Sequence, residues 1–194
     1  YEVLYGKPYI LATCFENKVH LHFKSFFQVN SVQMEVLYKQ ALQAANLDSS
    51  MTVIDLYAGT GTIGMMAARY VKQVIGVEIV PEAVENAKEN YALNDLYNGS
   101  YYCMDASVFA HEMKEKVDVV FVDPPRKGMS EQGIDDIARL NPQRVVYVSC
   151  KPKTLDRNYK IFEQEGYHCE YVQPVDLFCQ TNGIECVAKL EKMD

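Results

Sequence analysis

One cysteine in the sequence lies where a reactive thiol would be accessible. Cys150 ends the apolar run in "VVYVSCKPKTLDRN" and is followed by Lys151 and Pro152, so it lies where a strand turns into a loop. A cysteine at that point is either a small core residue or a nucleophile, because a free thiol packs well in a core and a thiolate attacks carbon. The strand-end position favours Cys150 over the other cysteines as the reactive one.

One glutamate is unusual because it lies inside an apolar strand. Glu185 is part of "GIECVAKL". An ionisable side chain in such a strand costs several kcal/mol if it is dry and unpaired. Either a function or a surface-facing edge of the sheet must therefore explain it.

Three features along the first half of the chain fit an adenosine-containing ligand. "DLYAGTGTIG" places glycines, including Gly59, in a strand-to-helix turn, where backbone N–H groups become accessible, although such glycines are often only turn formers. Glu78 ends the next strand about twenty residues later, where an acid can accept hydrogen bonds from both ribose hydroxyls. Asp105 follows the third strand and could bind an adenine amino group or cap a helix. NAD and S-adenosylmethionine both remain open.

The stretch "VDPPRKG" adds a rigid loop directly after a carboxylate. Its paired prolines can hold Asp123 toward a cofactor or a planar base, and Arg126 is free for a phosphate or a partner carboxylate. An NAD-binding fold has no evident use for this loop together with a cysteine after the next strand. The combination favours methyl transfer.

These residues all follow predicted strands, which alternate with stretches of helical spacing. The predicted strands are 52–59, 73–79, 100–104, 117–123, 144–150, 167–176 and 184–192, and the predicted helices are 32–47, 62–71, 81–94, 105–113, 131–140 and 154–166. Apolar strands separated by helices indicate an α/β domain whose mostly parallel sheet is covered on both faces. The last two strands lack a crossover helix, so the last strand must be antiparallel. We expect one domain over 32–194, preceded by a strand-rich extension over 1–31.

The charge distribution is uneven. The net charge of −7 has the wrong sign for binding nucleic acid by bulk electrostatics alone. Basic residues nevertheless gather in the loop-like stretches that follow two predicted strands: Arg126, Lys127, Lys151, Lys153 and Arg157. An acidic body with a basic rim around one site is compatible with an anionic polymer as substrate.

The remaining patterns argue against metals and membranes. The six cysteines show no C-x-x-C spacing, which favours free thiols in a reducing compartment. His20 and His22 share one face of a strand, but no third ligand is near, so we expect a solvent-facing strand and no metal site. No apolar run reaches the roughly 18 residues of a membrane span, and we expect a cytoplasmic protein. The chain begins without methionine, which suggests a part of a longer protein.

Several stretches together resemble one known family. They are "SFFQVNSVQ" (25–33), "DLYAGTGTIG" (55–64), "GVEIVPEAVENAKEN" (76–90), "VDPPRKG" (122–128), "VVYVSCKPKTLDRN" (145–158) and "PVDLFCQTNGIECVAKL" (174–190). In this order they are similar to the catalytic domain of the RNA uracil-5 methyltransferases, which make 5-methyluridine in tRNA and 23S rRNA. The resemblance covers essentially the whole chain. It implies a Rossmann-like class I methyltransferase fold with a seven-stranded sheet and S-adenosyl-L-methionine as cofactor.

The resemblance also implies roles for individual residues. Cys150 corresponds to the nucleophile that adds to uracil, and Glu185 to the base that removes the proton from the target carbon. The contacts to S-adenosylmethionine would come from Gln28, Tyr57, Gly59, Thr62, Glu78, Asp105 and Asp123. Cations lower a thiol pKa, and the residues close to Cys150 in sequence that could do so are Lys151, Lys153 and Arg157.

The chain departs from the family pattern at two positions. Gly183 stands where the family usually has histidine, and Cys179 where it usually has proline. We expect these changes to loosen the loop that places Glu185.

The activity implied by the resemblance is methylation of carbon 5 of a uridine in RNA. The forms "FFQVN", "VDPPRKG" and "VSCKP" are more similar to the 23S rRNA enzymes, so 23S rRNA is the favoured partner and tRNA the alternative. An amino-methylating enzyme that uses the "DPPR" loop and needs no thiol is a second reading, and a cofactor-binding module without turnover is a third. Family members also carry an RNA-binding domain and a central domain, which we expect to be missing from this chain.

Overall fold

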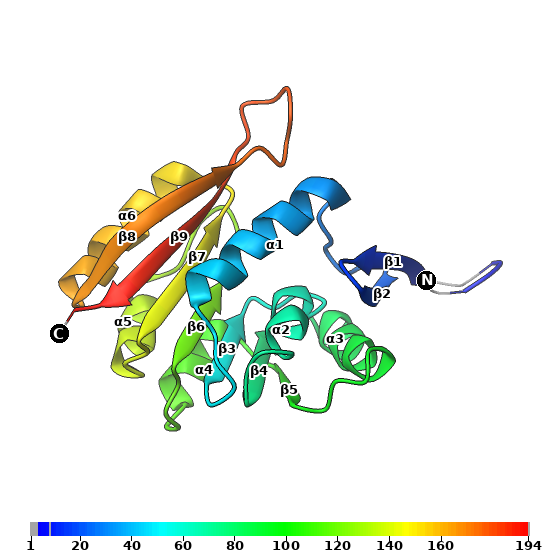
Figure 1. Ribbon diagram of the computed structural model, residues 1–194, viewed down its shortest axis with the longest axis horizontal. Helices are drawn as coiled ribbons and strands as arrows, with labels where there is room; N and C mark the ends of the chain where they lie inside the picture. The colour runs from blue at the N-terminus through cyan, green and yellow to red at the C-terminus, as the bar shows by residue number, and fades with distance from the viewer. Residues whose placement is uncertain (1–3, 8, 194) are drawn as a thin grey trace.

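The computed structural model describes residues 4–7 and 9–193 and is built around a seven-stranded sheet with the order β5-β4-β3-β6-β7-β9-β8 (Figure 1). The strands are β3 (Thr52–Leu56), β4 (Gln73–Glu78), β5 (Gly99–Cys103), β6 (Val119–Val122), β7 (Arg144–Ser149), β8 (Tyr167–Val175) and β9 (Glu185–Lys192). Pairing is parallel from β5 to β7, whereas β9 is antiparallel to both β7 and β8. The predicted mostly parallel sheet with an antiparallel last strand is confirmed.

Helices cover both faces of the sheet because successive strand residues point to opposite sides. Val53 and Val119 point to one face, and their neighbours Ile54 and Val120 point to the other. The first face is covered by α1 (Ser31–Ala45), α2 (Thr62–Ala67) and α3 (Pro81–Leu93), and the second by α4 (Ala106–Glu112), α5 (Glu131–Arg139) and α6 (Pro152–Gln164). Within the described residues, no helix is both long and apolar enough to cross a membrane.

The structure moves several predicted element ends at the edge of the sheet where a ligand would bind. The strand predicted over 52–59 ends at Leu56, because Tyr57, Gly59 and Gly61 have φ angles of 62°, 55° and 76° that no strand contains. The helix predicted from 154 begins earlier, at Pro152, where the fixed φ of proline suits a first turn. Cys150 and Lys151 therefore form the whole connection between β7 and α6.

A two-stranded hairpin precedes the sheet and docks on α3 (Figure 1). It consists of β1 (Tyr9–Cys14) and β2 (Asn17–His22). Two asparagines of α3 and the one that caps its C-terminus take the place of a neighbouring strand. Asn86, Asn90 and Asn94 accept from the backbone N–H groups of His22, His20 and Lys18 at 2.7, 2.7 and 2.9 Å.

The spacing of the asparagines along the helix matches the spacing of alternate residues along β2. Four helical residues rise about 6 Å and two strand residues about 6.6 Å. Asn90 also donates to the carbonyls of His20 and Thr60. The histidines of β2 are consequently half-buried, with Tyr9 stacked on His20 at 3.9 Å between ring centroids, rather than solvent-facing as predicted.

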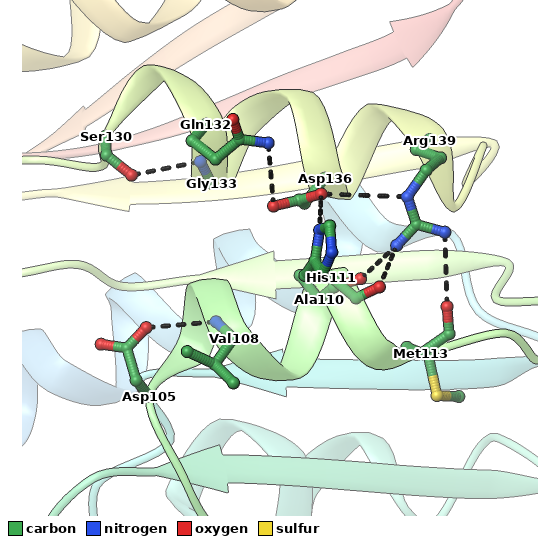
Figure 2. A network of polar contacts seen from close by, with 10 residues as sticks. All are labelled: Asp105, Val108, Ala110, His111, Met113, Ser130, Gln132, Gly133, Asp136 and Arg139. Carbon is green, nitrogen blue, oxygen red and sulfur yellow. Dashed lines mark hydrogen bonds and ion pairs between the residues drawn. The ribbon is translucent and has the colours of Figure 1, made fainter.

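A polar network joins α4 to α5 on the other face (Figure 2). The buried carboxylate of Asp136 accepts from Gln132 at 3.3 Å and lies 2.9 Å from Nδ1 of His111. Arg139 donates to the carbonyls of Ala110 and His111, each at 2.7 Å, and so satisfies the end of α4. The network fixes α4, whose first turn lies at the edge of the predicted site.

Candidate active site

A cavity of about 980 Å³ lies at the carboxyl ends of the parallel strands, where an α/β sheet binds ligands. Cys150, directly after β7, and Glu185, the first residue of β9, both line it. The predicted cofactor residues that line it are Gln28, Tyr57, Gly59, Glu78, Asp105 and Asp123. The fold thus brings together residues from separate strand ends.

Thr62 is the predicted site residue that does not line the cavity. Its side chain is buried at the start of α2, and its hydroxyl oxygen lies 3.0 Å from that of Thr60. Its observed contact is therefore with the glycine turn itself. A role for Thr62 in holding a cofactor stays a prediction.

The carboxylate of Glu78 is held rigidly by backbone donors. One oxygen accepts from the N–H of Gly59 at 2.9 Å, and the other accepts from those of Ile79 and Val80 at 2.8 and 2.9 Å. The left-handed φ of Gly59 and Tyr57 turns the chain so that these donors can converge. The glycine turn and the acid after β4 therefore form one unit.

Asp105 performs the helix-capping role that the sequence left open (Figure 2). One of its oxygens accepts from the N–H groups of Ser107 and Val108 at 2.9 and 3.2 Å. The residue is nonetheless exposed and lines the cavity, so capping and ligand contact are compatible. The nearby Tyr57 has a pKa raised by burial and by the charge of Asp105, and it is hydrogen-bonded to Ser107.

The Cys150 thiol is half-buried, and its pKa is raised above the usual value. Burial is the main cause, and the negative charge of Glu185 adds to it. A hydrogen bond with the Arg126 side chain acts in the opposite direction and favours the thiolate. Arg126 belongs to the "DPPR" loop, which the fold brings beside the cysteine.

This arrangement corrects the sequence prediction about which cations favour the thiolate. Lys151 and Lys153 are exposed, and Arg157 donates to the carbonyl of Lys127 at 2.6 Å. The structure gives the role to Arg126, which the sequence left free for a phosphate or a carboxylate.

Glu185 is buried, with 3% of its surface exposed. Its pKa is raised to about 7, mainly by burial and also by the charge of Asp123, while Arg126 acts to lower it. Burial alone raises the pKa of Asp123 to about 7. The cavity therefore contains two carboxyl groups that titrate near neutral pH, as expected of a site that moves protons.

The loop before Glu185 contains a hydrogen-bonded turn next to Gly183. The Thr181 hydroxyl donates to the carbonyl of Phe178 at 2.7 Å and accepts from the N–H of Gly183 at 3.0 Å. Glu185 itself pairs with Val175 of β8, so the sheet holds it independently of the loop. Strand pairing thus holds Glu185 at the start of β9, and the loosening expected from Gly183 and Cys179 stays a prediction.

Sequence reasoning does not assign some cavity residues. Met129 and Ser130 lie in the wall beyond the "DPPR" loop, and Ser107 lies in the first turn of α4. The position of Ser107, two residues after a candidate adenine-binding acid, is the signal that could have found it.

The profile of the tRNA (uracil-5-)-methyltransferase family matches residues 16–193. The chain belongs to this family.

Relatives of this uracil-5 methyltransferase family member support the assignment. An uncharacterized RNA methyltransferase from Bacillus cereus (strain ATCC 10987 / NRS 248) is 45% identical over 195 residues, which cover 99% of this chain and 42% of the relative. One from Halalkalibacterium halodurans is 47% identical over 193 residues, with 98% and 42% covered. The chain thus spans about 42% of the length of these relatives.

Solved structures agree with this placement. Pyrococcus abyssi tRNA (uracil-54, C5)-methyltransferase, in complex with S-adenosyl-L-homocysteine, superposes with a TM-score of 0.83 at 30% identity, covering 96% of this chain and 45% of that one. M. jannaschii TYW2, in complex with AdoMet, matches with a TM-score of 0.70 at 20% identity, covering 99% and 90%. The latter likeness shows the fold alone. The Rossmann-like methyltransferase fold predicted from the resemblance is confirmed.

Proposed function

We propose that this chain is the catalytic domain of an enzyme that methylates carbon 5 of a uridine in RNA through a covalent Cys150–uracil adduct. The observation that carries the proposal is that a cysteine and a buried glutamate share one cavity with the residues suited to an adenosine group. We assign residues 32–194 to the catalytic domain and 1–31 to an extension that leads into it.

The cofactor that fits the cavity is S-adenosyl-L-methionine, which supplies the methyl group on a sulfonium cation. The fixed carboxylate of Glu78 suits the ribose hydroxyls, and the uncapped oxygen of Asp105 suits the adenine amino group. Tyr57 and Gln28 complete the wall. The negative charges of Asp123 and Glu185 favour a cationic ligand between them.

Carbon 5 of uracil is a weak nucleophile, so the thiol must act first. The Cys150 thiolate adds to carbon 6, and the electron pair of the 5,6 double bond moves into an enolate whose carbon 5 can attack. Carbon 5 bonds to the methyl group as the sulfonium–methyl bond breaks to leave a thioether. Glu185 then takes the proton from carbon 5, the double bond reforms, and the sulfur–carbon 6 bond breaks to return the thiolate.

The raised pKa of Glu185 suits its role as the base. A carboxylate with a pKa of about 7 is partly ionised at neutral pH and far more basic than an ordinary glutamate. The Arg126 side chain suits the other half of the site, because it favours the thiolate against the opposing effect of burial.

The surface around the cavity suits an RNA substrate. Phe26 lines the cavity and is 70% exposed, so it could stack on a base that leaves its helix. The exposed Lys127, Lys151 and Lys153 follow the strand ends around the same site, where they can approach phosphates. An acidic chain with this local basic rim binds RNA at the site rather than over its whole surface.

The favoured substrate is 23S rRNA, and tRNA is the alternative. The forms of the "FFQVN", "VDPPRKG" and "VSCKP" motifs support 23S rRNA, whereas the names of the family and of the Pyrococcus relative support tRNA. Mass-spectrometric mapping of RNA from a deletion strain separates them. Loss of 5-methyluridine from 23S rRNA supports the first, and its loss from tRNA alone refutes it.

The covalent step is tested with Cys150→Ala and RNA that contains 5-fluorouridine. The variant should bind S-adenosylmethionine in calorimetry but form no covalent RNA adduct, whereas the unchanged protein should be trapped. Normal trapping of the variant rejects the assignment of Cys150. Full methylation activity in the variant would favour amino methylation by the "DPPR" loop, which needs no thiol.

A further inference from the structure

The helix that follows the nucleophile holds the "DPPRKGM" loop through one of its faces. Thr154, Arg157 and Asn158 are spaced i, i+3 and i+4 along α6, so they share a face. The Thr154 hydroxyl donates to the carbonyl of Arg126 at 3.2 Å, and Arg157 donates to that of Lys127 at 2.6 Å. We propose that these three residues form a latch that positions Arg126 beside the Cys150 thiol.

Asn158 makes the densest contacts of the latch. It is fully buried, its side-chain oxygen accepts from the N–H of Met129 at 3.0 Å, and its amide donates to the carbonyl of Met129 at 3.1 Å. The hydroxyl of Tyr147, on β7, donates to the same oxygen at 2.8 Å. The strand before Cys150 and the helix after it therefore hold the loop together.

Gly128 shows how closely the loop packs on the latch. It has a φ of +74°, and a Cβ there would lie 2.3 Å from Cγ2 of Thr154 and 2.4 Å from Oδ1 of Asn158. No side chain other than hydrogen fits between loop and helix. The backbone of the loop therefore rests directly on the residues that bind it.

The latch has a functional consequence because the loop that it holds lines the cavity. Arg126 and Cys150 line the same cavity, and Thr154 binds the backbone carbonyl of Arg126 itself. The hydrogen bond of Arg126 is what opposes burial in setting the thiol pKa. The inference rests on the proposed function, since it explains how the nucleophile is kept reactive. Thr154, Arg157 and Asn158 are positioning residues that act through Arg126.

The test is the pH dependence of Cys150 alkylation by iodoacetamide, followed on the Cys150 peptide by mass spectrometry in the intact protein. Thr154→Val keeps the shape and removes only the hydroxyl. It should raise the apparent thiol pKa and slow alkylation at pH 7.5 by about threefold to tenfold, the worth of one hydrogen bond. Thr154→Ser, which retains the hydroxyl, should restore the rate.

The matched control is Tyr159→Phe, which removes a hydroxyl from α6 that binds Glu163 rather than the loop. This variant should alkylate like the unchanged protein, and alkylation of the exposed Cys103 gives an internal reference. An unchanged profile in Thr154→Val at a native melting temperature overturns the latch. Alkylation needs neither RNA nor methyl transfer, so this failure is distinct from loss of trapping in the test of function.

Discussion

Glu185 should make the folded chain less stable as the pH rises. Its pKa is about 7 in the folded chain and 4.5 in an unfolded chain, so the folded state binds the proton more tightly. Below pH 4.5 both states are protonated and nothing is lost, whereas stability falls as the pH rises from there through 7. The shift of 7 − 4.5 = 2.5 corresponds to about 3 kcal/mol at high pH.

Glu185→Gln removes the charge while keeping the shape, so it should stabilise the protein at high pH. From the same two pKa values, the relief is about 1 kcal/mol at pH 5.5 and about 3 kcal/mol at pH 8.5. Urea denaturation at both pH values should therefore show the gain of the variant growing by about 2 kcal/mol. The lower pH stays above the isoelectric point of about 5.1, where the chain carries little net charge.

The control is Glu112→Gln, which changes an exposed glutamate on α4 and should shift stability by less than about 0.5 kcal/mol at either pH. A gain for Glu185→Gln that is the same at pH 5.5 and 8.5 would refute the reasoning. That result would mean that the Glu185 carboxyl is not desolvated in the folded state.

Further substitutions test the packing that supports the site. Asn90→Ala leaves the N–H and carbonyl of the half-buried His20 and the carbonyl of Thr60 without their partner. It should cost about 2–3 kcal/mol in urea denaturation, against less than about 0.5 kcal/mol for the exposed Lys88→Ala. Asp136→Asn should destabilise the protein at neutral pH but not at low pH. Burial alone would raise the pKa of Asp136, but its hydrogen bonds outweigh burial and lower that pKa, so the stability that the carboxylate contributes is lost as the pH falls. An equal loss of stability at pH 7 and pH 3 contradicts this. Gly128→Ala should lower the melting temperature far more than Gly59→Ala, because both have positive φ but only at Gly128 does a Cβ collide with α6. Equal shifts for the two glycines would show that the collision is relieved.

The order of elements and the strand-end residues could be predicted because both follow from local periodicity. Apolar runs and helical spacing identify strands and helices, and parallel strands place all their carboxyl ends on one edge of the sheet. For this reason the sequence predicts Glu78, Asp123 and Cys150 at one edge without any knowledge of their contacts. The capping of α4 by Asp105 also follows from a local rule.

The partners of each side chain were less predictable. Lys151 and Lys153 follow the thiol in sequence but are both exposed, which their position in the chain did not predict. Arg126 is distant in sequence yet adjacent in space, since β6 and β7 are neighbours in the sheet. The docking of β2 on the asparagines of α3 likewise joins segments that no local pattern connects.

The sequence by itself therefore determined the α/β class, the strand ends that carry the site, and the residues with the chemistry for a thiol, a base and an adenosine group. The tertiary structure alone decided which cation favours the Cys150 thiolate, how the latch on α6 holds that cation, and how burial brings Glu185 to a pKa of about 7. The physical reason is that periodicity depends on near neighbours in the chain. Desolvation and charge interactions depend on distance in space, which only the packing of the sheet and its helices sets.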